Sequence, residues 1–425
     1  MPQLATKLLV CAVLLCLSCY ACVAESPTPP NTCSGWVDGV TCQVGRGIIQ
    51  DSALNLTEIV WVGPENKKVY VGSPAVVQVP NTDTYLSSHD FFFNTLDVTV
   101  QVFKSSRSQG VGEWVYAGNV SGMYWANLFS HGPYIYMMGV SAGDDDNNRS
   151  IAITRTKTLG ETWEAPSILF PARSGHGTFY HCAPTPTILG SDGRFYRAYE
   201  VHEGYVGALI IFTRNPVNDT TNLMDPLSWQ MSSIETFSSD MVPTDWDQQT
   251  NWGWQEGNAV EMDGNVYDIL RIDGQTKKTN NKAALLKLDP QTNILKFQEM
   301  INFPSTDSKF TIRRDQKSGD FFTLSNNVTA EAISLGTVYA RNNLILARSK
   351  DLLHWHVCKT LLRDDSGFDP LDSARFTGFH YVDWIFSGED ILYAIRSGYR
   401  GSNTFHNANR LTVKREYGFR NACRL

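Results

Sequence analysis

The stretch "TKTLGETW" at residues 156–163 says more about the fold than any other part of this sequence. It follows the pattern Ser/Thr-x-Asp-x-Gly-x-Thr-Trp, with Thr158 in the place of the aspartate. A second copy, "SKDLLHW" at 349–355, keeps the serine, aspartate and tryptophan but is one residue shorter and lacks the glycine. A third and poorer copy, "SSRSQGVGEW", ends at Trp114. Each copy follows a β-rich run, so the pattern indicates tight turns inside repeated hairpins.

Short strands bounded by turn residues recur along the rest of the chain. Runs such as "DVTVQVF", "ALIIFTR" and "AALLKLD" are typical of strands, and no segment sustains a 3.6-residue period over three turns. The chain is therefore expected to be all-β, either as several sandwiches or as one closed propeller. The repeated turn favours the propeller. No linker divides residues 25–425, so a single domain is expected.

The three turns resemble Asp boxes, the hairpin turns of sialidase-type propellers. Beyond these turns, most of the sequence after the N-terminal segment is similar to the sialidase superfamily, and in particular to exported bacterial sialidase-like proteins. The segments that carry this resemblance include "MYWANLF", "YHCAPTP", "GNAVEMDGNVYDILRID", "KFTIRRD", "YARNNLILARSKDLLHW" and "HYVDWIF". The resemblance implies a six-bladed β-propeller. It also implies a site in which three arginines hold a substrate carboxylate, a tyrosine paired with a glutamate is the nucleophile, and an aspartate is the general acid/base.

The segment "WQEGNAVEMDGNVYDILRID" supplies two candidates for this site. Glu256 precedes one expected strand and Arg271 ends the next, with a "DGN" turn between them. The resemblance implies that Glu256 activates the tyrosine and that Arg271 binds the carboxylate. The plainer alternative is a glutamate at a strand edge and an exposed arginine.

Two further candidates follow along the chain. Arg341 stands directly before a strand and the second turn motif, which resembles the place of another arginine of the triad. Tyr381 follows about forty residues later and resembles the nucleophile, with Val382 in place of the usual serine. A half-buried strand aromatic is the ordinary role of a lone tyrosine. The order of these residues after Glu256 and Arg271 favours the functional role.

The first arginine of the family pattern is absent. The matching segment is "YVGSPAVV", where Gly72 and Ser73 precede Pro74. Arg313, Arg314 or Arg396 could replace the missing side chain from elsewhere in the chain, or the site could bind a different sugar.

These residue types suit one reaction. A free tyrosine has a pKa near 10 and becomes a nucleophile only when a carboxylate takes its proton. A neutral tyrosine also suits an anomeric centre beside a carboxylate, which would repel an anionic nucleophile; sialidases depart from the two-carboxylate scheme of other glycosidases. Arginine binds both oxygens of a carboxylate and stays charged.

Several residues compete for the acid/base role. "SSHDFFFNTLDVTV" offers Asp90 and Asp97, and Asp90 is preferred because its segment is most similar to the bacterial relatives. His181, next to Tyr180, could also act as an acid/base, although a lone histidine is more often structural. Propeller-shaped polysaccharide lyases use such His/Tyr pairs on uronic acids.

The N-terminus predicts export. One lysine precedes a short apolar stretch that ends in small residues at Ala24, as in a secretory signal peptide spanning residues 1–24. Five N-x-S/T sequons agree with this and mark expected surface loops; they are Asn55, Asn119, Asn148, Asn218 and Asn327.

The cysteines left after residue 24 are odd in number. They are Cys33, Cys42, Cys182, Cys358 and Cys423. Cys33 and Cys42 could bridge locally, or one of them could reach Cys423 and join the two ends of the fold. At least one cysteine stays free or pairs with another chain.

Charge and composition limit the partners. The formal net charge is -7 without a long run of like charge, so neither nucleic acid nor an anionic membrane is expected as a partner. No metal or other cofactor is predicted, since no C-x-x-C pair exists after residue 24. The sequence predicts a secreted, sialidase-type glycoside hydrolase that removes a terminal acidic sugar from a glycan. The alternatives are a lyase or hydrolase acting on uronate-containing polysaccharide and a carbohydrate-binding propeller without catalysis.

Overall fold

The computed structural model describes most of the chain after residue 41. The described residues are 42–44, 47–49, 52–63, 69–92, 99–105, 112–141, 149–172, 179–201, 207–246, 253–274, 276 and 280–424. The predicted signal peptide, Cys33, Asp97 and Asn148 lie outside them.

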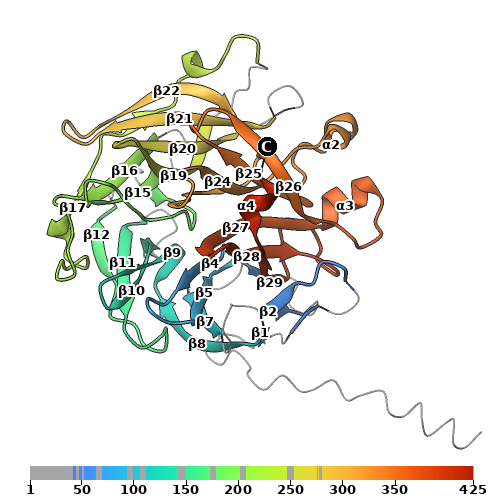
Figure 1. Ribbon diagram of the computed structural model, residues 1–425, viewed down its shortest axis with the longest axis horizontal. Coiled ribbons are helices and arrows are strands. Elements are labelled where there is room, and N and C mark those ends of the chain that lie inside the picture. The colour runs from blue at the N-terminus through green and yellow to red at the C-terminus, as the bar shows by residue number, and fades with distance from the viewer. Residues whose placement is uncertain are drawn as a thin grey trace, which may run out of the picture.

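The chain forms a six-bladed β-propeller, as the sequence predicted (Figure 1). The first blade consists of β4 (Ala75–Gln78), β5 (Tyr85–His89), β7 (Thr99–Ser105) and β8 (Trp114–Ser121), and the second of β9 (Met123–His131), β10 (Tyr134–Ser141), β11 (Ile151–Thr156) and β12 (Ser167–Phe170). The third contains β13 (Tyr180–His181), β14 (Ile188–Leu189), β15 (Phe195–Val201), β16 (Gly207–Thr213), β17 (Trp229–Met231) and β18 (Glu235–Thr236). The fourth contains β19 (Gly253–Met262), β20 (Asn265–Asp273), β21 (Lys282–Asp289) and β22 (Ile294–Asn302), and the fifth contains β23 (Thr311–Arg314), β24 (Phe321–Asn326), β25 (Asn343–Ser349) and β26 (Trp355–Arg363).

The sixth blade closes the ring with strands from both ends of the chain. Its order is β27 (Gly378–Ser387), β28 (Asp390–Gly398), β29 (Arg410–Glu416), β2 (Thr57–Val62) and β1 (Cys42–Val44). β2 pairs antiparallel with β29, and Figure 1 shows the blue N-terminal strand beside the red C-terminal one. A closed ring protects the strand edges that would otherwise be open to pairing.

The core lies between neighbouring blades, so the inner strands are buried on both faces. Every residue of β16 is buried, which explains its continuous apolar run. Between the fifth and sixth blades, Leu324, Leu346 and Trp384 are fully buried in one cluster. Burying each such side chain contributes roughly 1.5–3 kcal/mol to stability.

Both described turn motifs use a side chain to cap the turn. Thr158 Oγ1 accepts from Thr162 N at 2.8 Å, between β11 and β12. Asp351 Oδ1 accepts from Leu353 N at 2.9 Å and from His354 N at 2.8 Å, between β25 and β26. The turns are therefore blade hairpins, as predicted, and the third copy joins β7 to β8. Their assignment as Asp boxes remains a prediction.

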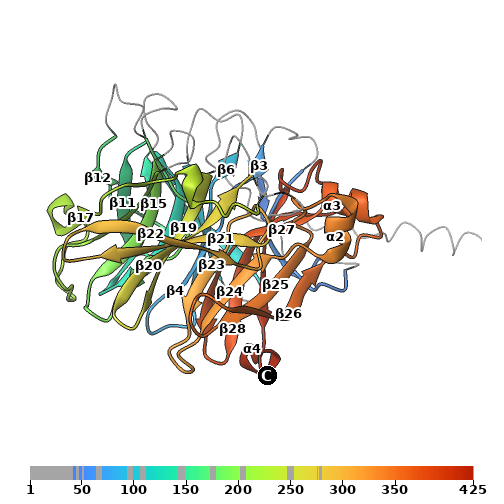
Figure 2. The same ribbon diagram turned by 90° about the horizontal axis from the view of Figure 1, so that it is seen from above.

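In the described part of the chain, three short helices flank the sheets. They are α2 (Ala330–Leu335), α3 (Pro370–Phe376) and α4 (Phe419–Ala422), and the 3-10 turns are η4 (Pro226–Ser228) and η5 (Ser239–Met241). Thr329 caps α2 and Asp369 caps α3 through side-chain bonds to backbone N–H groups. Figure 2 shows α4 on one face of the ring, opposite the pair of short strands β3 (Tyr70–Val71) and β6 (Phe91–Phe92). Within the described residues, no helix has the length and apolar character needed to cross a bilayer.

The C-terminus is tied down by a disulfide that the sequence did not predict. Cys423 pairs with Cys358 of β26, with 4.8 Å between the Cα atoms, so neither Cys33 nor Cys42 pairs with it. The bond joins the segment after the sixth blade to the outer strand of the fifth. Cys182 is a buried free thiol.

Candidate active site

Glu256 and Tyr381 both stand on β-bulges. The register of β19 against β20 shifts between Gln255 and Asn258, and that of β27 against β28 shifts between His380 and Asp383. Within these bulges Glu256 has φ 58° and Tyr381 has φ 53°. Left-handed backbone costs a residue other than glycine on the order of 1–3 kcal/mol, and bulges that re-aim side chains are common beside active sites.

The two side chains meet. Arg271 Nε donates to Glu256 Oε2 at 2.6 Å, and the Tyr381 hydroxyl interacts with the same carboxylate. Burial opposes the charge on Glu256, but Arg271, His181 and Tyr381 hold its pKa below the ordinary value. Burial and the charge of Glu256 raise the pKa of Tyr381. At neutral pH the proton therefore sits on the tyrosine, and the glutamate is ready to accept it.

Two more guanidinium groups lie over the tyrosine ring. The Cζ atom of Arg396 is 5.1 Å from the ring centroid of Tyr381, and that of Arg341 is 5.5 Å away. Arg341 precedes β25 and Arg396 belongs to β28. Burial lowers the pKa of Arg396 to about 10, which leaves it charged at neutral pH. The four residues predicted from their order along the chain thus converge, and Arg396 joins them.

The place of the missing arginine is filled by Asp90. A Cβ atom at Gly72 would lie 1.8 Å from Asp90 Oδ1, so no side chain fits there. The Asp90 carboxylate accepts from Ser73 N and from Trp125 N, both at 2.8 Å. Burial raises its pKa despite these bonds and the charge of Arg396. Asp90 therefore resists losing its proton, as a general acid must.

His181 is held by a carboxylate that the sequence did not single out. Its Nδ1 lies 2.8 Å from Glu200 Oε2, and Glu200 Oε1 accepts from Gly257 N at 2.7 Å, next to Glu256. The His181 ring packs edge-on against Trp125, with 4.6 Å between the centroids. The histidine is thus oriented beside the Tyr381–Glu256 pair.

The other candidate arginines have different partners. Arg313 donates to Asp383 Oδ1 at 3.1 Å, and Asp383 Oδ2 accepts from Val76 N at 2.9 Å, which links three blades. Arg314 donates to a turn carbonyl at Gly319, at the surface.

The bulge that carries Tyr381 rests on a buried lysine. Lys309 Nζ donates to the carbonyl of Val382 at 2.9 Å, and burial lowers the pKa of Lys309 to about 8. Neither this lysine nor Asp307, which contacts Arg271, was foreseen. Both precede β23 in "STDSKFTI", where their spacing offers no recognisable motif.

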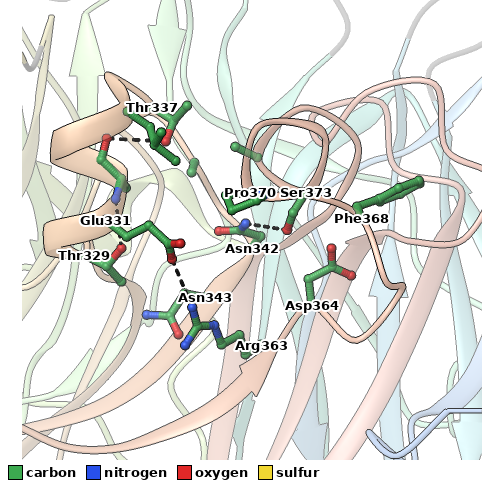
Figure 3. Close-up of a pocket in the computed structure, with 14 residues that line it drawn as sticks. Thr329, Glu331, Thr337, Asn342, Asn343, Arg363, Asp364, Phe368, Pro370 and Ser373 are labelled. Atoms are coloured by element: carbon green, nitrogen blue, oxygen red, sulfur yellow. Dashed lines mark hydrogen bonds and ion pairs between the residues drawn. The ribbon is translucent and has the colours of Figure 1, made fainter.

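A separate pocket of about 160 Å³ lies between α2 and α3 (Figure 3). In it Asn342 Nδ2 donates to Ser373 Oγ at 2.7 Å, and Arg363 pairs with Glu331 at 3.1 Å. It contains none of the predicted site residues. Within the described part of the chain, no cluster of three or more His, Cys, Asp or Glu side chains could hold a metal ion.

Solved structures similar to this chain are carbohydrate-active propellers. A Trypanosoma rangeli sialidase in complex with the inhibitor DANA matches with a TM-score of 0.58 and 13% identity over 89% of this chain. An α-L-arabinanase of Penicillium chrysogenum complexed with arabinobiose matches with a TM-score of 0.51 and 12% identity, over 88% of this chain and 98% of its own. An α-L-arabinofuranosidase of Fusarium graminearum with an iminosugar inhibitor matches with a TM-score of 0.51 and 10% identity, over 87% of this chain and 97% of its own.

These likenesses concern the fold. This chain spans 59% of the length of the Trypanosoma sialidase. No family model and no curated protein sequence matches it.

Proposed function

We propose that this chain is a glycoside hydrolase that removes a terminal acidic sugar from a glycan. The observation that carries the proposal is the interaction between Tyr381 and Glu256, with the guanidinium groups of Arg341 and Arg396 over the tyrosine ring. The similar solved structures support a carbohydrate substrate, because they are sialidase, arabinanase and arabinofuranosidase complexes.

In the first step, the Tyr381 oxygen attacks the anomeric carbon while its proton passes to Glu256. Asp90 gives its proton to the leaving oxygen as the glycosidic bond breaks. In the second step, Asp90 takes a proton from water and the water oxygen attacks the anomeric carbon. The bond from that carbon to the Tyr381 oxygen breaks, and Tyr381 recovers its proton from Glu256. Two displacements at one carbon retain its configuration.

Positive charge around the tyrosine suits an acidic sugar. Arg341 and Arg396 supply the charge nearest the ring, and the carboxylate of a substrate would neutralise it. The missing family arginine at Gly72 is compensated in this proposal by Arg396 from β28.

Hydrolysis of a sialoside reporter by the purified protein tests this function. Tyr381→Phe is expected to lower kcat at least a hundredfold, because the nucleophile is lost, while the folded structure is kept. Equal rates for the variant and the parent protein would contradict the mechanism.

A uronate lyase is the second candidate. The pairing of His181 with Glu200 favours it, because an oriented histidine can remove a carbon-bound proton. A rise in ultraviolet absorbance from unsaturated products, absent in His181→Ala, would support the lyase. Glycan binding with neither reaction would leave a binding propeller.

We also propose that the protein is exported. The signal-like N-terminus and the disulfide between Cys358 and Cys423 support this, because such bonds persist in oxidising compartments. N-terminal sequencing of protein recovered from the medium of expressing cells tests export, and a start at Glu25 is the expected result.

A further inference from the structure

Two of the three arginines at the site, Arg271 and Arg341, both contact Asp307 of the chain itself. Arg271 NH1 donates to the side chain of Asp307, and Arg341 NH2 donates to the backbone carbonyl of the same residue at 2.6 Å. Asp307 lies in the connection between β22 and β23. It therefore bridges Arg341, which the proposed function assigns to a substrate carboxylate, and Arg271, which the family resemblance assigns to the same carboxylate.

Arg271 has little capacity left for another anion. Its Nε donates to Glu256, its NH1 to Asp307 and Asp273, and its NH2 to Gln255 Oε1. A guanidinium has five N–H donors, so these four contacts leave at most one donor for another anion. A substrate carboxylate can bind both donors of one edge only after a present partner leaves.

Asp307 is the exposed carboxylate that competes most strongly for Arg271. The side chain of Glu256 is 3% exposed, whereas those of Asp307 and Asp273 are 32% and 34% exposed. Of these two exposed carboxylates, Asp307 makes the shorter contact with NH1, and the contact from Asp273 is long, at 3.4 Å.

The backbone around Asp307 is fixed. Thr306 and Ser308 are fully buried, and Ser308 N donates to the carbonyl of Thr306 at 2.7 Å. Ser305 Oγ bonds to the carbonyls of both Thr306 and Ser308. Release of the carboxylate from Arg271 therefore requires only rotation of the Asp307 side chain, with no movement of the loop.

We propose that Asp307 is a specificity-determining residue that competes with the carboxylate of an acidic sugar for Arg271. The proposal rests on the proposed function, because it takes the acidic sugar of that function as the ligand and adds Arg271 to the arginines that bind its carboxylate. An acidic sugar binds to Arg271 by displacing the Asp307 carboxylate. A neutral sugar has no carboxylate that could displace it. Asp307 thus sets the affinity of the site for acidic sugars.

Calorimetric binding of free sialic acid and free glucuronic acid tests the proposal, with arabinose as the neutral probe. Asp307→Asn removes the charge at nearly constant shape, and Asp307→Ala removes the whole side-chain contact. We expect both variants to bind at least one acid about tenfold more tightly than the parent protein, with arabinose unchanged. Asp273→Asn removes a charge at the same arginine without releasing the bridge and should change the affinity for the acid by less than a factor of three.

If Asp307 only positions Arg271, both Asp307 variants will bind the acids as weakly as the parent protein or more weakly, and the proposal is overturned. The proposal is also overturned if neither the parent protein nor any variant binds sialic acid or glucuronic acid. Thermal denaturation confirms that each variant is folded. Because binding is measured without turnover, a parent protein that fails to hydrolyse a sialoside refutes the proposed function and leaves this test intact.

Discussion

At the scale of single residues, the site depends on two carboxyl side chains whose environments shift their pKa values in opposite directions. Glu256 has its pKa lowered against burial by Arg271, while burial raises the pKa of Asp90. The charged form of Glu256 is thereby favoured, which suits a group that receives a proton, and the protonated form of Asp90 is favoured, which suits a group that gives one. The candidates Glu256, Arg271, Arg341 and Tyr381 could be predicted because their order resembles the family pattern.

Other site residues could not be predicted. Asp307 reaches Arg271 across 36 positions, and Glu200 reaches Gly257 across 57. Contacts between residues so far apart in the sequence depend on how the blades pack against one another. A local sequence pattern carries no information about that packing. For the same reason, the spacing could not choose among the possible replacements for the missing arginine, of which Arg396 lies over the Tyr381 ring and takes that role in the proposed function.

The two carboxylates predict a bell-shaped pH profile of kcat/KM. Activity should fall at low pH as Glu256 is protonated, in a range below ordinary glutamate, and at high pH as Asp90 loses its proton, in a range above ordinary aspartate. In Asp90→Asn, measured with an activated aryl glycoside that needs no general acid, the alkaline limb assigned to Asp90 should vanish. An unchanged alkaline limb would remove Asp90 from the acid role.

At the scale of elements, bulges and turns do the positioning. The bulges in β19 and β27 are seen in the register of their strand pairs, and the sequence analysis did not predict them. The hairpin turns, in contrast, could be predicted because Thr158 and Asp351 cap them locally. The disulfide was missed because β26 and α4 are separated by the whole sixth blade.

That disulfide should contribute to stability and leave the site unchanged. Closing a loop between cysteines with a sequence separation of 65 corresponds to about 4 kcal/mol in the chain-entropy account. We expect Cys358→Ser to lower the Tm by several degrees, as measured by circular dichroism, while activity at 25 °C is kept. Cys182→Ser, which breaks no disulfide, is the matched control. A Tm equal to that of the parent protein would show that α4 is held by packing alone.

At the scale of the whole molecule, the ring is closed by segments about 350 residues apart. A propeller was predictable from the repeated turns, but the pairing of β2 with β29 was not, because the short β2 carries no sign of its partner. Closure brings the first and last blades together, and it is what sets Asp90 near Arg396.

Closure should make unfolding cooperative and sensitive to β2. Ile59 is fully buried in the cluster that joins the first and sixth blades, so Ile59→Ala should cost about 2 to 5 kcal/mol in urea unfolding. Ile48, which is 59% exposed, provides the matched control, and Ile48→Ala should change stability by less than about 0.5 kcal/mol. Equal effects of the two substitutions would argue against closure through β2.

The proposed mechanism requires Tyr381 to form a covalent bond to the sugar. In Asp90→Asn, an activated aryl sialoside should still transfer its sugar to the tyrosine, whereas hydrolysis of the adduct slows because no group takes the proton from water. Peptide mass spectrometry after rapid acid quenching should then find the sugar mass on the peptide that contains Tyr381. The sugar on Glu256, or no adduct despite a burst of aryl alcohol release, would contradict the account.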